Sequence, residues 1–269
     1  MSFLNTLPLI EGLGKLEDAR LTLTAPSRLI DLLLGDEIDI GLVSIIDAQR
    51  APTGTPLAIV PCGMIGCDGP TMTVRLFSRR PPNEIGELHA DVDSHTSVAL
   101  ARIILEKSFG AKPRLVDFDA ESFLAGDRSP SPEEWPGAML MIGDKVVTHS
   151  PPVTLYPHQL DLGEEWKKLT GLPFVYAAWM CRAGIAGSEL VRTAAALLDR
   201  QRRHNATRLD WIVEARAPVR GWPAGLARTY LRDLLRFEVT PRHVEAVERF
   251  FDLAHECGVI AERRPTLWA

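Results

Sequence analysis

The stretch APSRLIDLLLGDEIDIGLVSI, residues 25–45, limits the possible folds more than any other part of the sequence. Pro26 and Ser27 predict a helix start, and Gly35 stands where the end of a helix favours a positive φ. The run IDIGLVSI that follows is almost continuously apolar, which is typical of a strand buried on both faces. A helix followed by a buried strand is half of a βαβ unit. The sequence therefore predicts an α/β protein with a parallel sheet.

The rest of the chain continues this alternation and then becomes helical. Strands are predicted at residues 72–78, 87–93, 114–119, 137–147 and 174–184. Helices are predicted at residues 94–111, 161–173, 187–204 and 240–258. This order predicts two α/β lobes between which the chain crosses twice, near TVRLFS and near LPFVYAAW. Lobe 1 is expected to contain residues 1–74 and 176–269, and lobe 2 residues 75–175.

Charge and hydropathy argue against two classes of partner. The chain has 269 residues, a net charge of −5 and no basic face, so nucleic-acid binding is not expected. Its one basic cluster, residues 199–208, lacks interleaved aromatic residues and is interpreted as a solvated helix face. No apolar run approaches the roughly 20 residues that cross a bilayer, so no membrane segment is predicted. The predicted partner is a small molecule, and no oligomeric state is predicted.

The cysteines indicate neither a metal site nor a redox site. The spacing of Cys62, Cys67, Cys181 and Cys257 matches no zinc or disulfide-exchange pattern. We therefore expect buried, reduced thiols in a cytoplasmic protein, and no bound metal.

Polar residues at the ends of predicted strands and the starts of predicted helices are the candidates for a site. In open α/β sheets, ligands bind beyond the carboxyl ends of strands and at helix N-termini. This rule selects Asn5, Thr6, Ser44, Asp68, Gly69, Ser94, His95, Thr96, Ser97 and Asp144.

Each of these candidates also has a purely structural explanation. In DSHTS, residues 93–97, one hydroxyl can simply cap the following helix, although free N–H groups beside hydroxyls make a good carboxylate receptor. Asp144 can bind loop backbone across the hinge as well as a ligand. The sequence has no GxGxxG after a strand, no P-loop and no GxSxG elbow. Spacing alone therefore predicts a two-lobed α/β protein that binds a small anion, without indicating a reaction.

Several segments, in the order found here, resemble the chorismate dehydratases of menaquinone biosynthesis, the enzymes of the futalosine route. They are SFLNTLPLI, LLLGDEIDIGLVSI, CDGPTMTVRLFSR, DSHTSVALARIIL, MLMIGD and DLGEEWKKLTGLPFVYAAW. The C-terminal helical region is also similar, so the resemblance covers nearly the whole chain. Its most specific parts are the SFLNTLPL start and the segment that ends in TGLPFVYAAW.

The resemblance implies a fold and a reaction. The fold would be that of a type II periplasmic binding protein, with two α/β lobes, a two-stranded hinge and a ligand cleft. The reaction would convert chorismate to 3-[(1-carboxyvinyl)oxy]benzoate by loss of water, without a cofactor. The functional asparagine of the family corresponds to Asn5. The hinge residues Pro173 and Phe174 join the predicted substrate-binding residues.

The resemblance does not identify a general base. No Asp or Glu stands out in the sequence as the base. One hypothesis is that the enolpyruvyl carboxylate of the substrate itself takes the ring proton.

Two features depart from the family pattern. Relatives begin with a short strand before the SFLNT segment, whereas Met1 directly precedes Ser2 here. We expect that first strand to be missing or encoded upstream. A serine is also expected near Asp68, where this chain has CDGP.

Three alternatives remain open from the sequence. One is a solute-binding protein without catalysis. Another is the related enzyme of the same route that forms 1,4-dihydroxy-6-naphthoate. The third is a sensor, or a degenerate paralogue, that binds an aromatic acid.

Overall fold

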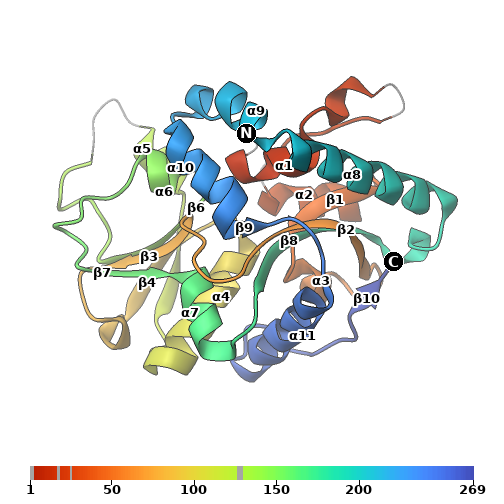
Figure 1. Cartoon of the computed structure of the whole chain (residues 1–269). Coiled ribbons are helices and arrows are strands. Elements are labelled where there is room, and N and C mark those ends of the chain that lie inside the picture. Colours follow the sequence, from red (N-terminus) through yellow and green to blue (C-terminus); the bar gives the residue numbers. More distant parts are fainter. Residues whose placement is uncertain (1–2, 17–18, 25, 126–129) are drawn as a thin grey trace.

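The computed structural model describes residues 3–16, 19–24, 26–125 and 130–269. These residues form two lobes, each built on a five-stranded sheet and covered by helices (Figure 1). The strands of one sheet come from both ends of the chain, and those of the other come from its middle. The chain therefore passes between the lobes twice, as the sequence predicts.

Lobe 1 contains a mixed sheet with the strand order β1-β8-β2-β10. Its strands are β1 (Ile40–Ser44), β2 (Leu57–Cys67), β8 (Phe174–Arg182), β9 (Leu235–Arg236), which pairs with β2, and β10 (Leu267–Trp268). In this sheet β8 is antiparallel to both β1 and β2, whereas β10 is parallel to β2. Within the described residues, β1 lies at the edge of the sheet. A further strand on that edge stays a prediction.

Lobe 2 contains the second sheet, with the strand order β5-β4-β6-β3-β7. Its strands are β3 (Val74–Ser78), β4 (Glu87–Asp91), β5 (Arg114–Phe118), β6 (Ala138–Ile142) and β7 (His158–Asp161). The pairs β4–β5 and β4–β6 are parallel, and β3 is antiparallel to β6 and β7. The exact lobe boundaries given by the sequence stay predictions.

Helices surround both sheets. Before the second crossing they are α1 (Leu7–Ile10), α2 (Pro26–Leu34), α3 (Asp47–Arg50), α4 (His95–Phe109), α5 (Ala120–Leu124), α6 (Lys145–Thr148) and α7 (Leu162–Thr170). After it they are α8 (Glu189–Thr207), α9 (Leu209–Arg216), α10 (Ala224–Arg228) and α11 (Pro241–Glu256). The long helix α8 packs against β2 and α1 (Figure 1). No helix in the described ranges is long and apolar enough to cross a membrane.

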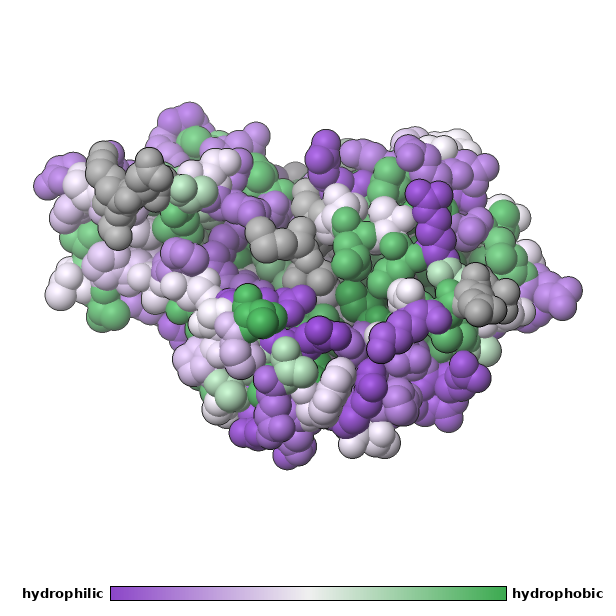
Figure 2. Space-filling model, turned by 90° about the horizontal axis from the view of Figure 1, so that it is seen from above, coloured by the Kyte–Doolittle hydropathy of each residue, from purple (hydrophilic) through white to green (hydrophobic). Residues whose placement is uncertain are grey.

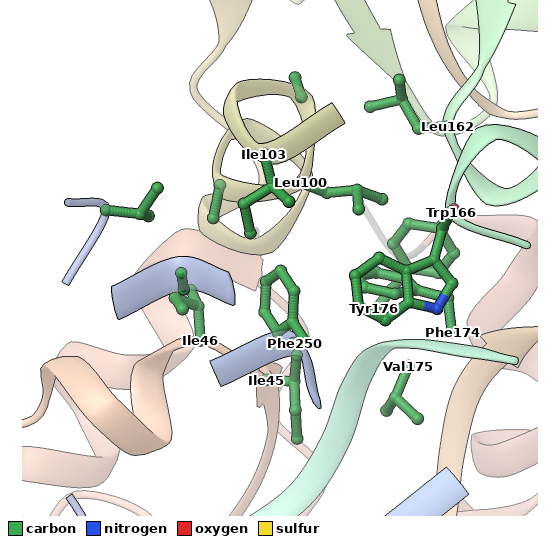
Figure 3. Packing of buried hydrophobic residues seen from close by; sticks show 14 of the residues in the cluster. Ile45, Ile46, Leu100, Ile103, Leu162, Trp166, Phe174, Val175, Tyr176 and Phe250 are labelled. Atoms are coloured by element: carbon green, nitrogen blue, oxygen red, sulfur yellow. The ribbon is translucent and has the colours of Figure 1, made fainter. Parts of the chain in front are cut away.

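One continuous apolar core contains residues of both lobes and lies beside the second crossing segment. Figure 3 shows Trp166 of α7 beside Phe174 and Tyr176 of β8, with Phe250 of α11 close by. The Trp166 and Phe174 ring centroids are 5.1 Å apart, and Phe250 is also 5.1 Å from Phe174. Edge-to-face aromatic pairs of this kind add to the stabilisation that comes from buried area. This core fixes the second crossing segment relative to α4 and α7.

The first crossing segment, residues 68–73, is held by a single buried carboxylate. Asp161, at the end of β7, accepts hydrogen bonds from the backbone N–H of Thr71 at 2.8 Å and of Met72 at 2.6 Å. It also caps α7 by accepting from the N–H groups of Gly163 and Glu164. Met72 has a φ of 72°, a strained conformation that persists only where neighbouring contacts hold it. Asp161 thus links the cap of a lobe 2 helix to the hinge.

Several sequence predictions are wrong in detail. The strand predicted within residues 38–45 pairs antiparallel with β8 in the described structure, because the chain returns from lobe 2 beside it. The positive φ expected at Gly35 falls on Asp36 instead. The strand predicted for residues 137–147 ends at Ile142, and Lys145–Thr148 form α6. The long strand β2 was not predicted, since Pro61 and Gly63 interrupt its apolar pattern.

Other predictions agree with the structure. Ser94 caps α4 and Gly110, with a φ of 67°, ends it. Gly171 ends α7 in the same way, with a φ of 72°. All four cysteines are buried and free.

Candidate functional site

A cavity of about 600 Å³ lies between the two lobes. Lobe 1 contributes residues before and along β1, part of β8 and one face of α8, and lobe 2 contributes the start of α4 and the end of β6. Seen from above, apolar side chains gather in the middle of this face of the molecule, with polar and charged side chains around them (Figure 2). A volume of this size suits one small organic ligand.

The cavity lining contains both polar and apolar side chains. Its uncharged polar residues are Asn5, Thr6, Thr22, Thr24, Ser44, Thr71, Thr73, Ser94, Ser97, Tyr176, Thr193 and Tyr230, and the cationic Arg20 also lines it. Leucine and isoleucine side chains from residues 10–42 and from α8 form the apolar remainder. The lining acids in the described residues are Glu37 and Asp39, which precede β1. An extended strand separates Asp39 from Ser44 by about 16 Å.

Asn5 and Thr6 reach the cavity from a short turn at the start of the chain. Residues Leu4–Thr6 form a 3-10 turn that leads directly into α1, with Pro8 in the first turn of that helix. The backbone N–H of Leu4 donates to both carboxylate oxygens of Asp144, each at 3.1 Å. The Thr6 hydroxyl donates to the carbonyl of Phe3 at 2.8 Å. The turn is therefore fixed to lobe 2, with the Asn5 side chain at the cavity wall.

Ser94 and Ser97 lie in the cavity wall at the N-terminus of α4. The Ser94 hydroxyl accepts from the Ser97 N–H at 3.2 Å and donates to the Ser97 hydroxyl at 3.0 Å. Ser44 ends β1 on the opposite wall. The first-turn N–H groups of a helix and nearby hydroxyls favour an anionic ligand, so this part of the wall suits a carboxylate.

The sequence analysis did not select several polar residues of the cavity, and four of these, Thr71, Thr73, Tyr176 and Tyr230, form two close pairs. Thr71 and Thr73 come from the first crossing, Tyr176 from β8, and Tyr230 from a π-helical turn at Thr229–Leu234. The Thr71 and Tyr176 hydroxyls are 2.6 Å apart, and the Thr73 and Tyr230 hydroxyls are 2.7 Å apart. The sequence around the two threonines is typical of a loop, and the two tyrosines look like ordinary buried aromatic residues. Only the return of the chain through the hinge brings them together.

The other predicted site residues lie outside the cavity lining, and each has a structural contact. They are Asp68, Gly69, His95, Thr96, Asp144, Pro173 and Phe174. Asp68 forms an ion pair with Lys167 at 2.6 Å, and that lysine lowers the pKa of Asp68. The Pro173 carbonyl accepts from the Trp166 indole at 2.8 Å, and Phe174 is fully buried. A ligand role for these residues stays a prediction.

The Asp144 carboxylate binds backbone N–H, which is one of the two roles that the sequence allows for it. Its carboxylate accepts from Leu4 of lobe 1, and burial raises its pKa above the ordinary value. Beside it, Gly143 has a φ of 73° and lies directly against the Phe3 ring, where a Cβ atom would come within 2.7 Å of the ring. The Gly143–Asp144 turn therefore positions residues 3–5 without a ligand.

His95 and Thr96 connect the lobes beside the cavity. The His95 Nδ1 atom is 2.9 Å from the carboxylate of Asp47 in α3, and the Thr96 hydroxyl accepts from the Ile46 N–H at 3.3 Å. Asp47 is buried, whereas 36% of the His95 side chain is exposed. The hydrogen bond that His95 donates to Asp47 raises the pKa of His95 above 6.5, against the effects of burial and of Arg50, while Asp31 adds to the increase.

We expect the His95–Asp47 contact to stabilise the protein mainly below neutral pH. A raised histidine pKa in the folded state gives stability that is complete below the unfolded pKa and is lost as pH rises through the folded pKa. The free energy of unfolding should therefore differ between the wild type and His95→Gln more at about pH 5.5 than at about pH 8.5. The difference should stay below about 1 kcal/mol because the imidazole is partly exposed. Urea unfolding at both pH values measures it, and an equal difference at both would contradict the assignment.

No group of three or more His, Cys, Asp or Glu side chains in the described residues is arranged to hold a metal ion. A separate charged cluster contains the buried Lys145 and Asp91 and the partly buried Asp93. Lys145 lies 2.9 Å from Asp91 and 2.7 Å from Asp93. Burial raises the pKa of Asp91 to about 6, although Lys145 acts in the opposite direction. Lys145 therefore pairs with both carboxylates, and it directly follows the Gly143–Asp144 turn in the chain.

Solved structures with a similar fold are mostly binding proteins. A protein from Archaeoglobus fulgidus superposes with a TM-score of 0.69 at 13% identity, covering 96% of both chains. The periplasmic aliphatic sulphonate binding protein of Escherichia coli has a TM-score of 0.63 at 14% identity, covering 99% of this chain and 91% of its own. A Candida albicans protein described as having the generic periplasmic binding protein fold has a TM-score of 0.64 at 14% identity. The fold is thus periplasmic-binding-protein-like, as the resemblance implied.

Sequence comparison identifies the family. A chorismate dehydratase of Thermus thermophilus is 28% identical over 245 residues, which cover 85% of this chain and 84% of that enzyme. The sequence family described as menaquinone biosynthesis matches residues 1–256. Because this match includes both lobes and the whole cavity, the protein belongs to the menaquinone-biosynthesis family.

Proposed function

We propose that this protein is a chorismate dehydratase, which removes water from chorismate to form 3-[(1-carboxyvinyl)oxy]benzoate. The similarity to the Thermus thermophilus enzyme along most of both chains supports this reaction. The cavity supports it chemically, because Asn5 lines it together with several serine, threonine and tyrosine hydroxyls and with Arg20, which can bind an anionic ligand. A cytoplasmic location is part of the proposal, since free buried cysteines are typical of proteins in a reducing compartment.

The cavity can hold the two carboxylates of chorismate at separate places. We assign one carboxylate to the N-terminus of α4, where Ser94 and Ser97 provide hydroxyls beside free helix N–H groups. The Ser44 and Thr6 hydroxyls lie on the facing wall for the second carboxylate or the ring hydroxyl. Apolar side chains then surround the ring and exclude water, which strengthens every hydrogen bond inside the site.

The reaction itself needs a base, a leaving group and an aligned substrate. The bond between ring carbon and hydrogen breaks beside the carbon that carries the hydroxyl. Its electron pair forms the new ring double bond, and the hydroxyl leaves with a proton as water. We propose that the enolpyruvyl carboxylate of the substrate takes the proton, since the lining carboxylates among the described residues, Glu37 and Asp39, precede β1 and are separated by that strand from Ser44. The ring becomes aromatic, so the protein contributes mainly orientation and desolvation.

Asn5 is the proposed catalytic residue. Its amide provides an acceptor and donors at the cavity wall without adding a charge that would repel the substrate. A neutral amide can hold the ring hydroxyl in the geometry from which it leaves. It does not change protonation state during the reaction, so it acts by position.

The direct test is to incubate the purified protein with chorismate and to follow the products by mass spectrometry and chromatography. A product lighter by one water that comigrates with 3-[(1-carboxyvinyl)oxy]benzoate is expected. A protein-free incubation controls for spontaneous breakdown of chorismate. Binding of chorismate without dehydration would overturn the proposal in favour of a solute-binding protein. Failure to bind or convert chorismate would also overturn it, and the precursor of 1,4-dihydroxy-6-naphthoate would be tested next.

A further inference from the structure

Two short segments from different lobes meet beside the cavity. The lobe 1 segment follows β1 and contains Ile46 and Asp47, and the lobe 2 segment is the start of α4, with His95 and Thr96. His95 Nδ1 donates to the Asp47 carboxylate at 2.9 Å, and the Ile46 N–H donates to the Thr96 hydroxyl at 3.3 Å. These two hydrogen bonds, made by residues 46, 47, 95 and 96, are called the interlobe bridge below.

Each half of the interlobe bridge adjoins hydroxyls that line the cavity. Ser44 lies two positions before the lobe 1 half, and Ser94 and Ser97 flank the lobe 2 half. Ile46 and Thr96 are completely buried, and Ile46 lies in the same core as the apolar side chains of α4 (Figure 3). Water cannot replace these hydrogen bonds unless the two segments separate. The bridge therefore sets the spacing between the serine of one wall and the two serines of the other.

His95 is the residue on which the polar half of the bridge depends. The Asp47 side chain is only 3% exposed, and its Oδ2 atom has no hydrogen-bond partner among the described residues. His95 is the donor to the other oxygen, Oδ1. A buried carboxylate keeps a fixed place only while a hydrogen-bonding partner compensates for the water that it has lost. Because His95 does not belong to the cavity lining, its replacement would loosen the bridge without removing a group that faces the ligand.

We propose that His95 is a positioning residue that acts through Asp47, so that the interlobe bridge holds the two serine-bearing walls of the cavity at the spacing that the substrate needs before it binds. The inference rests on the proposed function, in which hydroxyls of the two walls bind the carboxylates of chorismate. Walls that are already in place spare the free energy that ordering them on binding would cost. His95 does not touch the substrate in this arrangement, so it acts on affinity and not on the bonds that change.

Steady-state kinetics of His95 variants test this role. His95→Leu removes the donor, and we expect KM for chorismate to rise about tenfold while kcat changes by less than about twofold, because wall spacing affects the ground state and the transition state alike. His95→Asn keeps an N–H group near the place of Nδ1 and should restore most of the affinity. A variant with less folded protein would instead lower the apparent kcat at unchanged KM. Unchanged KM in His95→Leu, or the same KM in the leucine and asparagine variants, would overturn the proposal.

A double-mutant cycle tests whether His95 acts through Asp47. Asp47→Ala should raise KM in the same direction as His95→Leu. In the Asp47→Ala background, His95→Leu should have almost no further effect on KM, because no carboxylate remains for the imidazole to hold. Additive effects of the two changes would show that His95 acts by another route and would overturn the proposal.

His89 offers a matched control for the loss of a histidine that is paired with a carboxylate. Its Nε2 atom lies 2.9 Å from the Glu87 carboxylate, the same separation as in the interlobe bridge. Both residues belong to β4 of lobe 2, and neither lines the cavity. His89→Leu should therefore leave kcat and KM unchanged. An equal rise of KM in His89→Leu and His95→Leu would reject a specific role for the contact between the lobes.

Hydrogen exchange of the Ile46 backbone amide gives a test that does not depend on turnover. This amide donates across the bridge to Thr96, so it exchanges with solvent only when the two segments separate. His95→Leu should speed its exchange, measured by NMR in the absence of ligand. The Val92 amide, which donates to the Phe118 carbonyl within lobe 2, should exchange as in the wild type. Unchanged exchange at Ile46 in His95→Leu would reject the inference even if the protein dehydrates chorismate.

The two readouts separate the inference from the function on which it rests. If wild-type protein does not dehydrate chorismate, the proposed function fails, and the exchange of the Ile46 amide still decides whether His95 holds the interlobe bridge. If wild-type protein dehydrates chorismate while His95→Leu changes neither KM nor the exchange rate, only the inference fails.

Discussion

Replacing Asn5 with alanine is expected to lower kcat and kcat/KM for chorismate dehydration by about 10²- to 10³-fold. The physical reason is that a positioned hydrogen-bonding group in a cavity sheltered from water acts on the leaving hydroxyl at no cost of reorganisation. The effect on stability should be small, since the buried Oδ1 atom has no partner to lose among the described residues. Steady-state kinetics with mass detection of the product measure the change.

Asn83→Ala is the matched control for Asn5→Ala. Asn83 is exposed in a 3-10 turn of lobe 2, Pro82–Glu84, and takes no part in the cavity. The control should retain wild-type kcat and KM. Full turnover in Asn5→Ala with unchanged substrate affinity would show that the proposed role of Asn5 is wrong.

The second large effect is expected at Asp161, in the hinge. Asp161→Ala should lower the free energy of unfolding by about 3 kcal/mol, because it leaves buried N–H groups of the hinge and of α7 without an acceptor. The carboxylate accepts from Thr71 and Met72 in the hinge and from Gly163 and Glu164 in the helix. Without it the strained Met72 can relax and Thr71 can leave the cavity wall, so kcat/KM should fall as well. Urea unfolding and kinetics measure the two effects.

Asp119→Ala is the control that separates the hinge contacts from simple helix capping. Asp119 caps α5 by accepting from the Ser122 N–H at 2.9 Å, but it is exposed and contacts no crossing segment. Its replacement should cost about 1 kcal/mol, the usual effect of losing an N-cap. If Asp161→Ala cost no more than Asp119→Ala, the hinge bonds would contribute nothing and the interpretation would be rejected.

The sequence predicted elements well where one local rule decided them. The helix predicted at residues 94–111 is α4, which Ser94 caps and Gly110 ends, because a cap and a positive φ are properties of a few neighbouring residues. The sequence did not predict the structure correctly where distant segments decide which strands pair. The edge strand β1 pairs antiparallel because β8 returns beside it, and the alternation of β2 is obscured by Pro61 and Gly63.

The residues of the candidate site also divide into those that a local rule selects and those that only the packing of distant segments brings to the cavity. Asn5, Thr6, Ser44, Ser94 and Ser97 could be selected from the sequence, since strand ends and helix starts meet at the edge of an α/β sheet. His95 and Thr96 could be selected too, yet the structure uses them to join the lobes. Tyr176 and Tyr230 carried no local signal.

The sequence by itself therefore determined the two α/β lobes, the two crossings, the buried thiols and the turn that presents Asn5. These follow from composition, periodicity and short-range rules. Only the tertiary structure decided which polar groups face one cavity, because Tyr230 is far from Asn5 in the chain and lines the same cavity only through packing. It also decided that the Asn5 carbonyl stays unpaired, since the pairing of a buried polar atom depends on every neighbour around it.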